Sequence, residues 1–383
     1  MDGVEVPKRK IRPGSEHMAT WIELFYDLIF VAALLIFSSA ASHLRVSQSL
    51  WIVAVFAASW WVWFTTTVCA NRFHMSDLTH RVLLLCQMLL IVLMATESRA
   101  SVKGHTALLC SEFGLLLGTL AVMHARAARL PTSDRLYARR LAALSAIGGV
   151  IFLATVPLPE DWRLGVAGIA LLVLLPAALV SLSALAPLSE ADEDHIVERM
   201  GLFTLIVCGE AFIEVAITAS HQTITGIDIV SLIFEFVLVF ALFTAYFEDI
   251  PAAGLLQRRM ALWALAHMVA QGGIAAVGVG ASKLVDLNDA ARLPDSEILK
   301  LTVPLAVVYL ALVVVGACTR RRPWRFLAIS RAVAAGAVVV VGLVCWAIPF
   351  VHLPEALPLF CAVAVLNAAA VVRLRAGTVV APA

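Results

Sequence analysis

Charged side chains are scarce in this sequence. Only 14% of its 383 residues are Asp, Glu, Lys or Arg, whereas a soluble domain carries about a quarter. Hydrophobic residues make up 61%, and the mean hydropathy is +0.93. No polar stretch is long enough to form a soluble domain of its own. The composition therefore predicts an all-α polytopic membrane protein.

Several chemical motifs are also missing. The net charge is +1 and there is no long basic tract, so nucleic acid is not an expected partner. No Cys-x-x-Cys pair, metal-ligand cluster, glycine-rich phosphate loop or nucleophilic triad occurs, so we expect no metal and no cofactor. The cysteines lie in or beside apolar runs, where we interpret them as packing residues. They are Cys69, Cys86, Cys110, Cys208, Cys318, Cys345 and Cys361.

The beginning of the sequence lacks the pattern of a cleaved signal peptide. Residues 1–19 are polar and contain four basic residues, and the apolar run that follows has no small-residue cleavage site. That run is also longer than the apolar core of a signal peptide. We therefore expect a cytoplasmic tail over 1–19 and then a retained membrane helix.

Long apolar runs fill the rest of the sequence. About 20 apolar residues are needed to cross the hydrocarbon core as a helix, and twelve segments are long enough. The predicted helices cover 20–43, 49–70, 79–97, 105–125, 140–157, 163–186, 197–219, 227–249, 259–281, 299–318, 327–348 and 355–373. A short tail, 374–383, follows the last one.

The distribution of Lys and Arg supports twelve crossings. With the N-terminus on the cytoplasmic side, 21 of the 28 basic residues fall in cytoplasmic segments and 7 in outer ones. Basic residues accumulate on the cytoplasmic side of membrane proteins. We therefore predict that both termini are cytoplasmic, in a multi-pass protein of the bacterial inner membrane.

An internal similarity predicts two halves of six helices each, 20–186 and 197–373. Glu23 and Glu198 begin corresponding helices, and Gln87 and His267 occupy comparable positions about 180 residues apart. Parallel repeats of this kind occur in secondary transporters. The acidic stretch 187–196 between the halves is interpreted as a plain solvated linker.

The first helix carries two carboxylates within its apolar run. Glu23 and Asp27 are four residues apart and therefore share one face of a helix. A carboxylate at membrane depth costs several kcal/mol unless it is paired, protonated or hydrated, so such residues usually face a bundle interior. We predict that this face is part of the functional site.

Basic and amide side chains lie close to these carboxylates in the predicted topology. Arg72 and Arg81 occur at the cytoplasmic ends of the second and third helices, where they can pair with the carboxylates or serve only as positive anchors. Asn71 and Gln87 flank them. We predict that these four side chains contribute to substrate binding.

The seventh helix repeats the pattern of charge within an apolar run. Arg199 lies at its cytoplasmic mouth, and Glu210 falls near the middle of the membrane at a rise of about 1.5 Å per residue. Glu210 is thus a candidate proton carrier or general acid, and Arg199 is a candidate charge partner. Glu97, Glu112, Glu214 and Glu235 are further acids in the outer half, where they extend a path across the membrane.

Aromatic and imidazole side chains are the remaining candidates. Trp60 and Trp61 lie deep in the second helix, where they either pack or line a pocket. His267 lies on the ninth helix without a second His or Cys nearby, so it is either an interior hydrogen-bonding group or part of a binding site.

Several of these segments together resemble a known family. The opening Trp-Ile-Glu-Leu-Phe-Tyr-Asp (21–27), the segment 71–87, the run Glu-Arg-Met-Gly-Leu-Phe (198–203) with Gly209 and Glu210, and Tyr246-Phe247 with His267 are similar to the bacterial low temperature requirement protein A family. The resemblance covers nearly the whole chain. It implies a bacterial inner-membrane protein, and it assigns no chemistry.

Two functions are compatible with these residues. A transporter or channel-like protein would use Glu23, Asp27 and Glu210 to bind a proton or small cation. A membrane-embedded enzyme would use a buried Glu or Asp as general acid on a lipophilic substrate such as an isoprenoid or lipid. A structural or signalling role is the third alternative. Membrane lipid is an expected partner in each case, and the oligomeric state is not predicted.

Overall fold

The computed structural model describes residues 20–42, 46–75, 77–101, 106–182, 185, 190–220, 226–248, 255–286, 295–320, 324–348 and 353–379. The predicted tail over 1–19 lies outside them. These residues form twelve α-helices, and no strand occurs among them. The predicted all-α fold with twelve helices is therefore confirmed.

The helices follow the predicted segments closely. Their bounds are α1 Trp21–Ser42, α2 Val46–Phe73, α3 Leu78–Ser101, α4 Thr106–Ala127, α5 Arg135–Thr155, α6 Glu160–Ser181, α7 Glu190–Ser220, α8 Gly226–Phe247, α9 Met260–Asp286, α10 Asp295–Ala317, α11 Trp324–Ala347 and α12 Leu353–Val379. Eleven of them, α2 to α12, are long and apolar enough to cross a membrane.

Several boundaries differ from the predictions by four or more residues. Helix α5 begins at Arg135 instead of 140, α7 begins at Glu190 instead of 197, and α12 continues to Val379 through the predicted tail. Hydropathy ends a segment where charged residues begin. A helix, by contrast, continues into the charged region when its polar side chains find partners. The stretch 187–196 is therefore not a plain linker, because it is helical from Glu190 onward.

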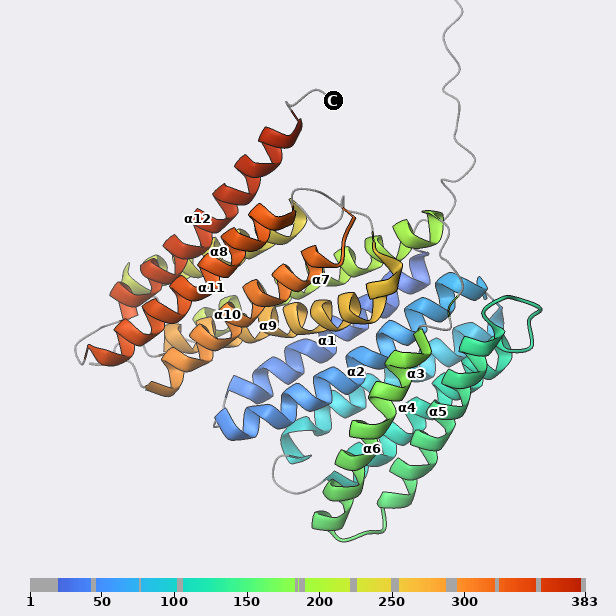
Figure 1. The fold of residues 1–383 in the computed structure, drawn as a ribbon. Helices are drawn as coiled ribbons and strands as arrows, with labels where there is room; N and C mark the ends of the chain where they lie inside the picture. Colours follow the sequence, from blue (N-terminus) through green and yellow to red (C-terminus); the bar gives the residue numbers. More distant parts are fainter. Residues whose placement is uncertain are drawn as a thin grey trace, which may run out of the picture.

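The helices pack into a bundle with α2 and α9 at its centre (Figure 1). In α2, 78% of the membrane-length segment is buried, against 22% in the peripheral α6. The glycines of α9 permit close contact with its neighbours: a Cβ at Gly278 would lie 2.7 Å from the Cα of Ala211 in α7, and one at Gly280 would lie 2.7 Å from the carbonyl oxygen of Lys300. Small residues serve this purpose between membrane helices.

Packing between helices follows a similar order in the two parts of the chain. Helix α1 packs on α3, α3 on α4, α4 on α5 and α5 on α6; likewise α7 packs on α9, α9 on α10, α10 on α11 and α11 on α12. Helix α8 lies along α12, however, whereas α2 packs in the centre against α4, α7 and α9. The division into two six-helix halves stays a prediction. Contacts between the two sets run mainly through α1 and α2 on one side and α7 and α9 on the other.

The helix ends predicted to be cytoplasmic lie together. We call this the inner end of the bundle; it includes the start of α1, the end of α2 and the starts of α5 and α7. Arg72 at the end of α2 pairs with Asp134 before α5 and with Asp192 in α7. At the opposite, outer end, Arg163 and Glu160 of α6 meet Thr106 at the start of α4. The alternation of chain direction implied by the basic residues thus agrees with the fold.

Candidate functional site

A buried ion pair joins α1 to α7. The Arg199 Nη2 atom donates to Asp27 Oδ1 at 2.6 Å, and both side chains are at most 1% exposed. Arg199 Nη1 also lies 3.4 Å from Glu23 Oε2. Glu23, Asp27 and Arg199 were all predicted from the sequence, and the fold brings them together. We call these three residues with His195 the α1–α7 cluster.

Asp27 is held by more than its counter-charge. The indole Nε1 of Trp63 in α2 donates to Asp27 Oδ1 at 2.7 Å. The other carboxylate oxygen, Oδ2, is buried and has no hydrogen-bond partner among the described residues. An unpaired buried carboxylate oxygen is costly, so the cluster retains capacity to accept a proton or a water molecule at this atom.

Glu23 also stabilises the start of α1. Thr20 precedes α1, and its backbone N–H and its hydroxyl both donate to Glu23 Oε2, at 2.7 and 2.9 Å. A Thr followed three residues later by Glu is a capping box, in which the acid satisfies the helix start. This signal was readable in Thr-Trp-Ile-Glu, and it explains why α1 begins at Trp21.

His195 completes the cluster from α7. Its Nε2 lies 3.7 Å from Glu23 Oε1. With a neutral imidazole the cluster holds two carboxylates and one guanidinium, a net charge of −1, and a protonated imidazole would bring it to zero. His195 was not predicted from the sequence, because it lies in the stretch interpreted as a solvated linker.

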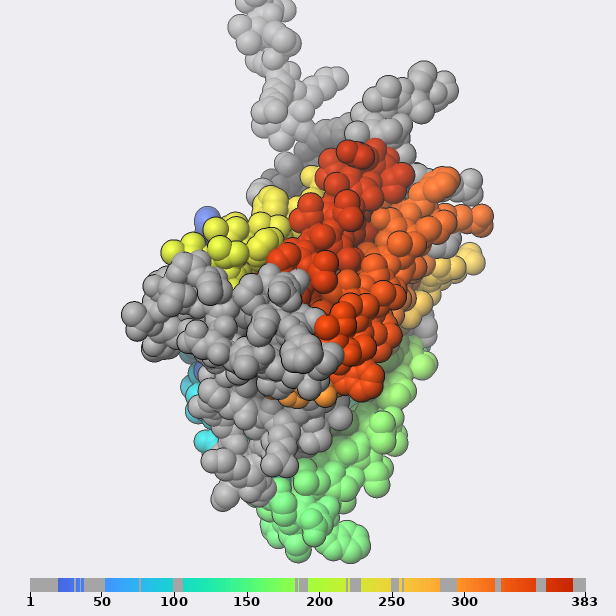
Figure 2. Space-filling model, turned by 90° about the vertical axis from the view of Figure 1, so that its left-hand side faces the viewer, coloured from blue at the N-terminus to red at the C-terminus, as the bar shows by residue number. Residues whose placement is uncertain are grey.

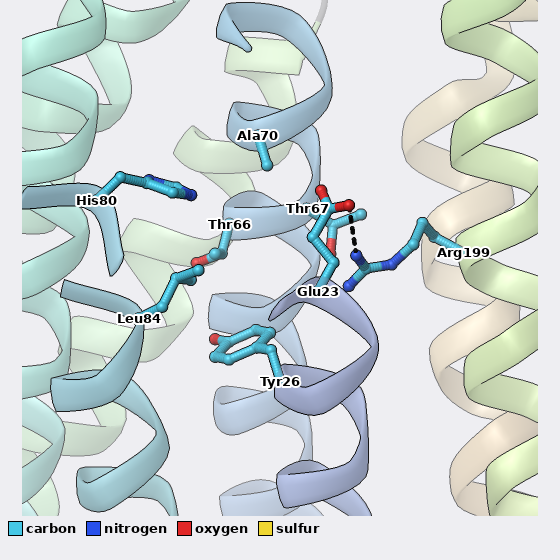
Figure 3. A pocket seen from close by; sticks show the side chains of 8 residues that line it. All are labelled: Glu23, Tyr26, Thr66, Thr67, Ala70, His80, Leu84 and Arg199. Carbon is cyan, nitrogen blue, oxygen red and sulfur yellow. Dashed lines mark ion pairs between the residues drawn. The ribbon is translucent and has the colours of Figure 1, made fainter. Parts of the chain in front are cut away.

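A small cavity adjoins the cluster (Figure 3). Its lining comes from α1, α2, α3 and α7, and consists of Glu23, Tyr26, Thr66, Thr67, Ala70, His80, Leu84 and Arg199. The volume of the cavity is about 10 Å³, which is room for about one water molecule. Ligand pockets for drug-sized molecules measure about 300–1,000 Å³. The cavity therefore suits water or a small ion and excludes a lipid.

Gln87 supports one wall of this cavity. Its Oε1 accepts hydrogen bonds from the Tyr26 hydroxyl at 2.8 Å and from the Thr66 hydroxyl at 3.2 Å. Its Nε2 contacts the sulfur of Met123 in α4. Gln87 therefore ties four helices together beside the cavity, and its amide holds Tyr26 in place.

The tryptophans of α2 are packed and hydrogen-bonded. The Trp60 ring stacks on Phe64 at a centroid distance of 5.3 Å, and its Nε1 donates to Gln271 Oε1 of α9 at 2.6 Å. Gln271 Nε2 in turn donates to the Thr204 hydroxyl of α7 at 2.9 Å. Trp61, 8% exposed, packs near Phe64. These rings fill the bundle centre. Packing is therefore better supported for the tryptophans than lining of a pocket.

The remaining predicted residues lie apart from the cluster. Arg81 is exposed, so it does not pair with Glu23 or Asp27. His267 accepts at Nε2 from the Tyr246 hydroxyl, 3.1 Å away, and places Nδ1 2.9 Å from the Trp263 carbonyl oxygen. Because a carbonyl only accepts, Nδ1 carries the proton and the imidazole is satisfied within its own helix pair.

Glu210 is buried on the same helix as Arg199 but farther along it. Glu210 is eleven residues after Arg199, which is about 17 Å and slightly more than three full turns, so the two lie on one face of α7. Because α7 begins at Glu190, Glu210 lies in the outer half of the segment Asp192–Ile217 and not at its middle. The mid-membrane position of Glu210 stays a prediction.

The first turns of α7 anchor the inner end. Arg72 Nη1 donates to Asp192 Oδ2 at 2.7 Å, Arg72 Nε donates to Asp134 Oδ2 at 2.9 Å, and Asn71 Nδ2 donates to the Asp192 carbonyl oxygen at 3.0 Å. Glu193 accepts from Arg320 and from the backbone N–H of Leu255. Asn71 and Arg72 thus contact α7, although the sequence had predicted that they bind a substrate.

We expect the Arg72 pairing to stabilise the fold strongly. Arg72→Gln would leave two acids facing each other at side chains that are 4% and 13% exposed, and should lower the free energy of unfolding by about 3 kcal/mol. Arg126→Gln is the matched control, because its pair with Asp77 is 27% and 51% exposed and should contribute less than about 1 kcal/mol. Thermal unfolding in detergent measures both, and equal losses would contradict the prediction.

Membrane-length helices with apolar outer faces and inward-facing charge define an integral, multi-pass membrane protein. The chain belongs to the bacterial low temperature requirement A protein (LtrA) family, whose model matches residues 18–371. The resemblance seen in the sequence is thereby confirmed. No curated protein matches the chain. The family description states a low temperature requirement and names no ligand or reaction, so the function has to follow from the site.

Proposed function

We propose that the protein is a transporter that moves protons, or a small cation, across the bacterial inner membrane. The α1–α7 cluster is its binding site near the cytoplasmic face. The observation that carries the proposal is the fully buried Asp27–Arg199 pair, which has a second carboxylate and an imidazole beside it and opens on a cavity for about one water molecule. Intramembrane ionisable residues of this kind mark ion and proton pathways.

The position of the cluster supports a gating role. The carboxylates come from α1 and the guanidinium from α7, and these helices belong to the two different sets of the bundle. A relative movement of the two sets would therefore break this pair. Protonation of Asp27 would weaken it by removing the charge that Arg199 meets, which couples proton binding to movement.

A route toward the outer end continues along α7. Thr204 lies between Arg199 and Glu210 in the sequence, and its hydroxyl accepts a hydrogen bond from the Gln271 amide. Glu210 lies on the same face of α7 as Arg199. Both are buried. In the proposal, Glu210 is the next proton acceptor, and the Trp60–Gln271–Thr204 hydrogen bonds separate it from the cluster in this closed arrangement.

An enzyme acting on a lipophilic substrate is the weaker alternative. Polar residues do gather at one end, as an enzyme with a single mouth would require. The tryptophans that would line its pocket, however, pack on Phe64 and Phe203 and use their indole nitrogens within the bundle. The cavity beside the acids is also far smaller than such a substrate.

The test is a flux assay in proteoliposomes that contain a trapped pH indicator. A proton-conducting wild type should acidify or alkalinise the lumen when a pH gradient is imposed, and the rate should fall severalfold in Glu23→Gln. Glutamine still accepts from the Thr20 N–H in a capping box, so this change removes charge and preserves the helix start.

Glu297→Gln serves as the control for this assay. Glu297 pairs with Lys300 on α10, away from the cluster, and its replacement should leave the rate unchanged. Wild-type vesicles that pass neither protons nor alkali cations, measured with indicators for each, would refute the proposal. Flux that is equal in Glu23→Gln and the wild type would remove Glu23 from the site.

A further inference from the structure

A further buried carboxyl group lies in α8, a helix that contributes no residue to the α1–α7 cluster. Glu235 is 1% exposed, and neither of its carboxyl oxygens has a hydrogen-bond partner among the described residues. It stands six residues, or about 9 Å, from the outer end of the segment Ile229–Phe247. A carboxylate in such surroundings has no group to balance its charge.

The neighbours of Glu235 are polar and uncharged. Cys361 of α12 lies next to it and donates its thiol to the carbonyl oxygen of Phe234 at 2.9 Å. Tyr309 of α10 lies near Cys361, fully buried, with a hydroxyl that also has no partner in the described part of the chain.

These surroundings suit a proton better than a metal ion. Ca²⁺ takes six to eight oxygen ligands, and Mg²⁺ requires an octahedron of them. Here one carboxyl group, one more distant hydroxyl and one thiol are the only side-chain donors that we find in the described structure. A single proton, in contrast, converts the carboxylate to a neutral acid and removes the cost of burying its charge.

Helix α8 separates this carboxyl group from the lipid-facing surface. Ile233 and Phe236, on either side along the helix, are 55% and 59% exposed. In Figure 2, α8 (yellow) adjoins α12 (red) on the face toward the viewer, and the two helices pack along each other. Cys361 of α12 lies beside Glu235, so separation of α8 and α12 would open this side of the carboxyl group to water.

We propose that Glu235 is a second proton-binding site of this protein, occupied while α8 and α12 are packed and released when they separate. The proton leaves the carboxyl oxygen for water, and the resulting carboxylate is hydrated in the opened contact. This site is independent of the proposed transport through the α1–α7 cluster, because it lies on other helices and its occupancy is measurable without flux.

The first experiment labels the acid with dicyclohexylcarbodiimide in proteoliposomes. This apolar reagent adds to a protonated carboxyl group: the oxygen bonds to its central carbon, and a nitrogen takes the proton. Peptide mass spectrometry should find Glu235 labelled in mildly acidic buffer and the label lost in alkaline buffer. Glu297, paired with Lys300 on α10, is the internal control and should stay unlabelled. Absence of label at Glu235 at every pH, or its protection by Na⁺ or K⁺, would overturn the proposal.

The second experiment measures the opening of the α8–α12 contact by alkylation of Cys361. Thiols react faster at high pH in any case, so the comparison is between the wild type and Glu235→Gln at each pH. Alkylation of Cys361 should rise more steeply with pH in the wild type, because Gln cannot lose a proton. Cys110, buried in α4, should behave alike in both proteins. Equal pH profiles for Cys361 would show that ionisation of Glu235 does not open the contact, and would overturn this part of the proposal.

Discussion

Arg199→Gln is expected to cause the largest loss of stability of any single substitution in the α1–α7 cluster. The change takes the cluster from a net charge of −1 to −2 and leaves Asp27, which is 0% exposed, without its counter-charge. Breaking a buried ion pair from one side costs about 3–5 kcal/mol. The apparent melting temperature in detergent should therefore fall by about 5–10 °C.

Replacing the acidic partner, Asp27, should cost much less stability than replacing Arg199. Asp27→Asn leaves an amide oxygen that can still accept from Trp63 and Arg199, while Glu23 remains 3.4 Å from the guanidinium. The double variant Asp27→Asn/Arg199→Gln should recover a large part of the stability lost in Arg199→Gln, because the uncompensated acid is gone. A double variant that is as unstable as the sum of the two single ones would show that the residues do not interact.

Asp27→Asn and Glu210→Gln are expected to abolish transport while the protein remains folded. Neither amide can release a proton, and each substitution keeps the size of the side chain it replaces. The wild-type, Asp27→Asn and Glu210→Gln proteins should elute alike in gel filtration, and proton flux into vesicles should fall to the background of empty liposomes in both variants. These rates should be compared with those of the Glu297→Gln control.

The outcome separates the two acids. Loss of flux only in Asp27→Asn would confine the site to the α1–α7 cluster, and would remove Glu210 from the route. Full flux in both variants would refute the assignment of both residues. Glu235→Gln, tested in the same assay, would further determine whether the second proton site contributes to transport or acts apart from it.

Hydropathy and charge predicted the helices and several partners. The apolar runs gave twelve helices, since a membrane segment needs little more than length and composition. Glu23, Asp27 and Arg199 were predictable because charge within an apolar run has to be compensated. The sequence did not predict which arginine pairs with Asp27. Arg72 and Arg81 lie nearer in sequence, yet Arg199 of α7 is the partner of Asp27.

The missed residues share a physical cause. Asp134, Asp192 and His195 lie in stretches that look solvated, because acidic side chains beside a membrane usually face water. Their roles depend on tertiary contacts with Arg72 and Glu23, and no local pattern encodes these. The start of α7 was misplaced for a related reason, since it was read from hydropathy and the charged first turns were left out.

The wide sequence separation of Asp27 and Arg199 has a consequence for biosynthesis. The two residues are 172 positions apart, and at roughly 5–20 residues per second a ribosome needs about 10–30 s to cover that distance. Helix α1 therefore reaches the membrane well before its counter-charge is synthesised. During this interval Asp27 is far less costly to insert as the neutral acid. Completion of the nascent bundle then includes the release of a proton as Arg199 arrives.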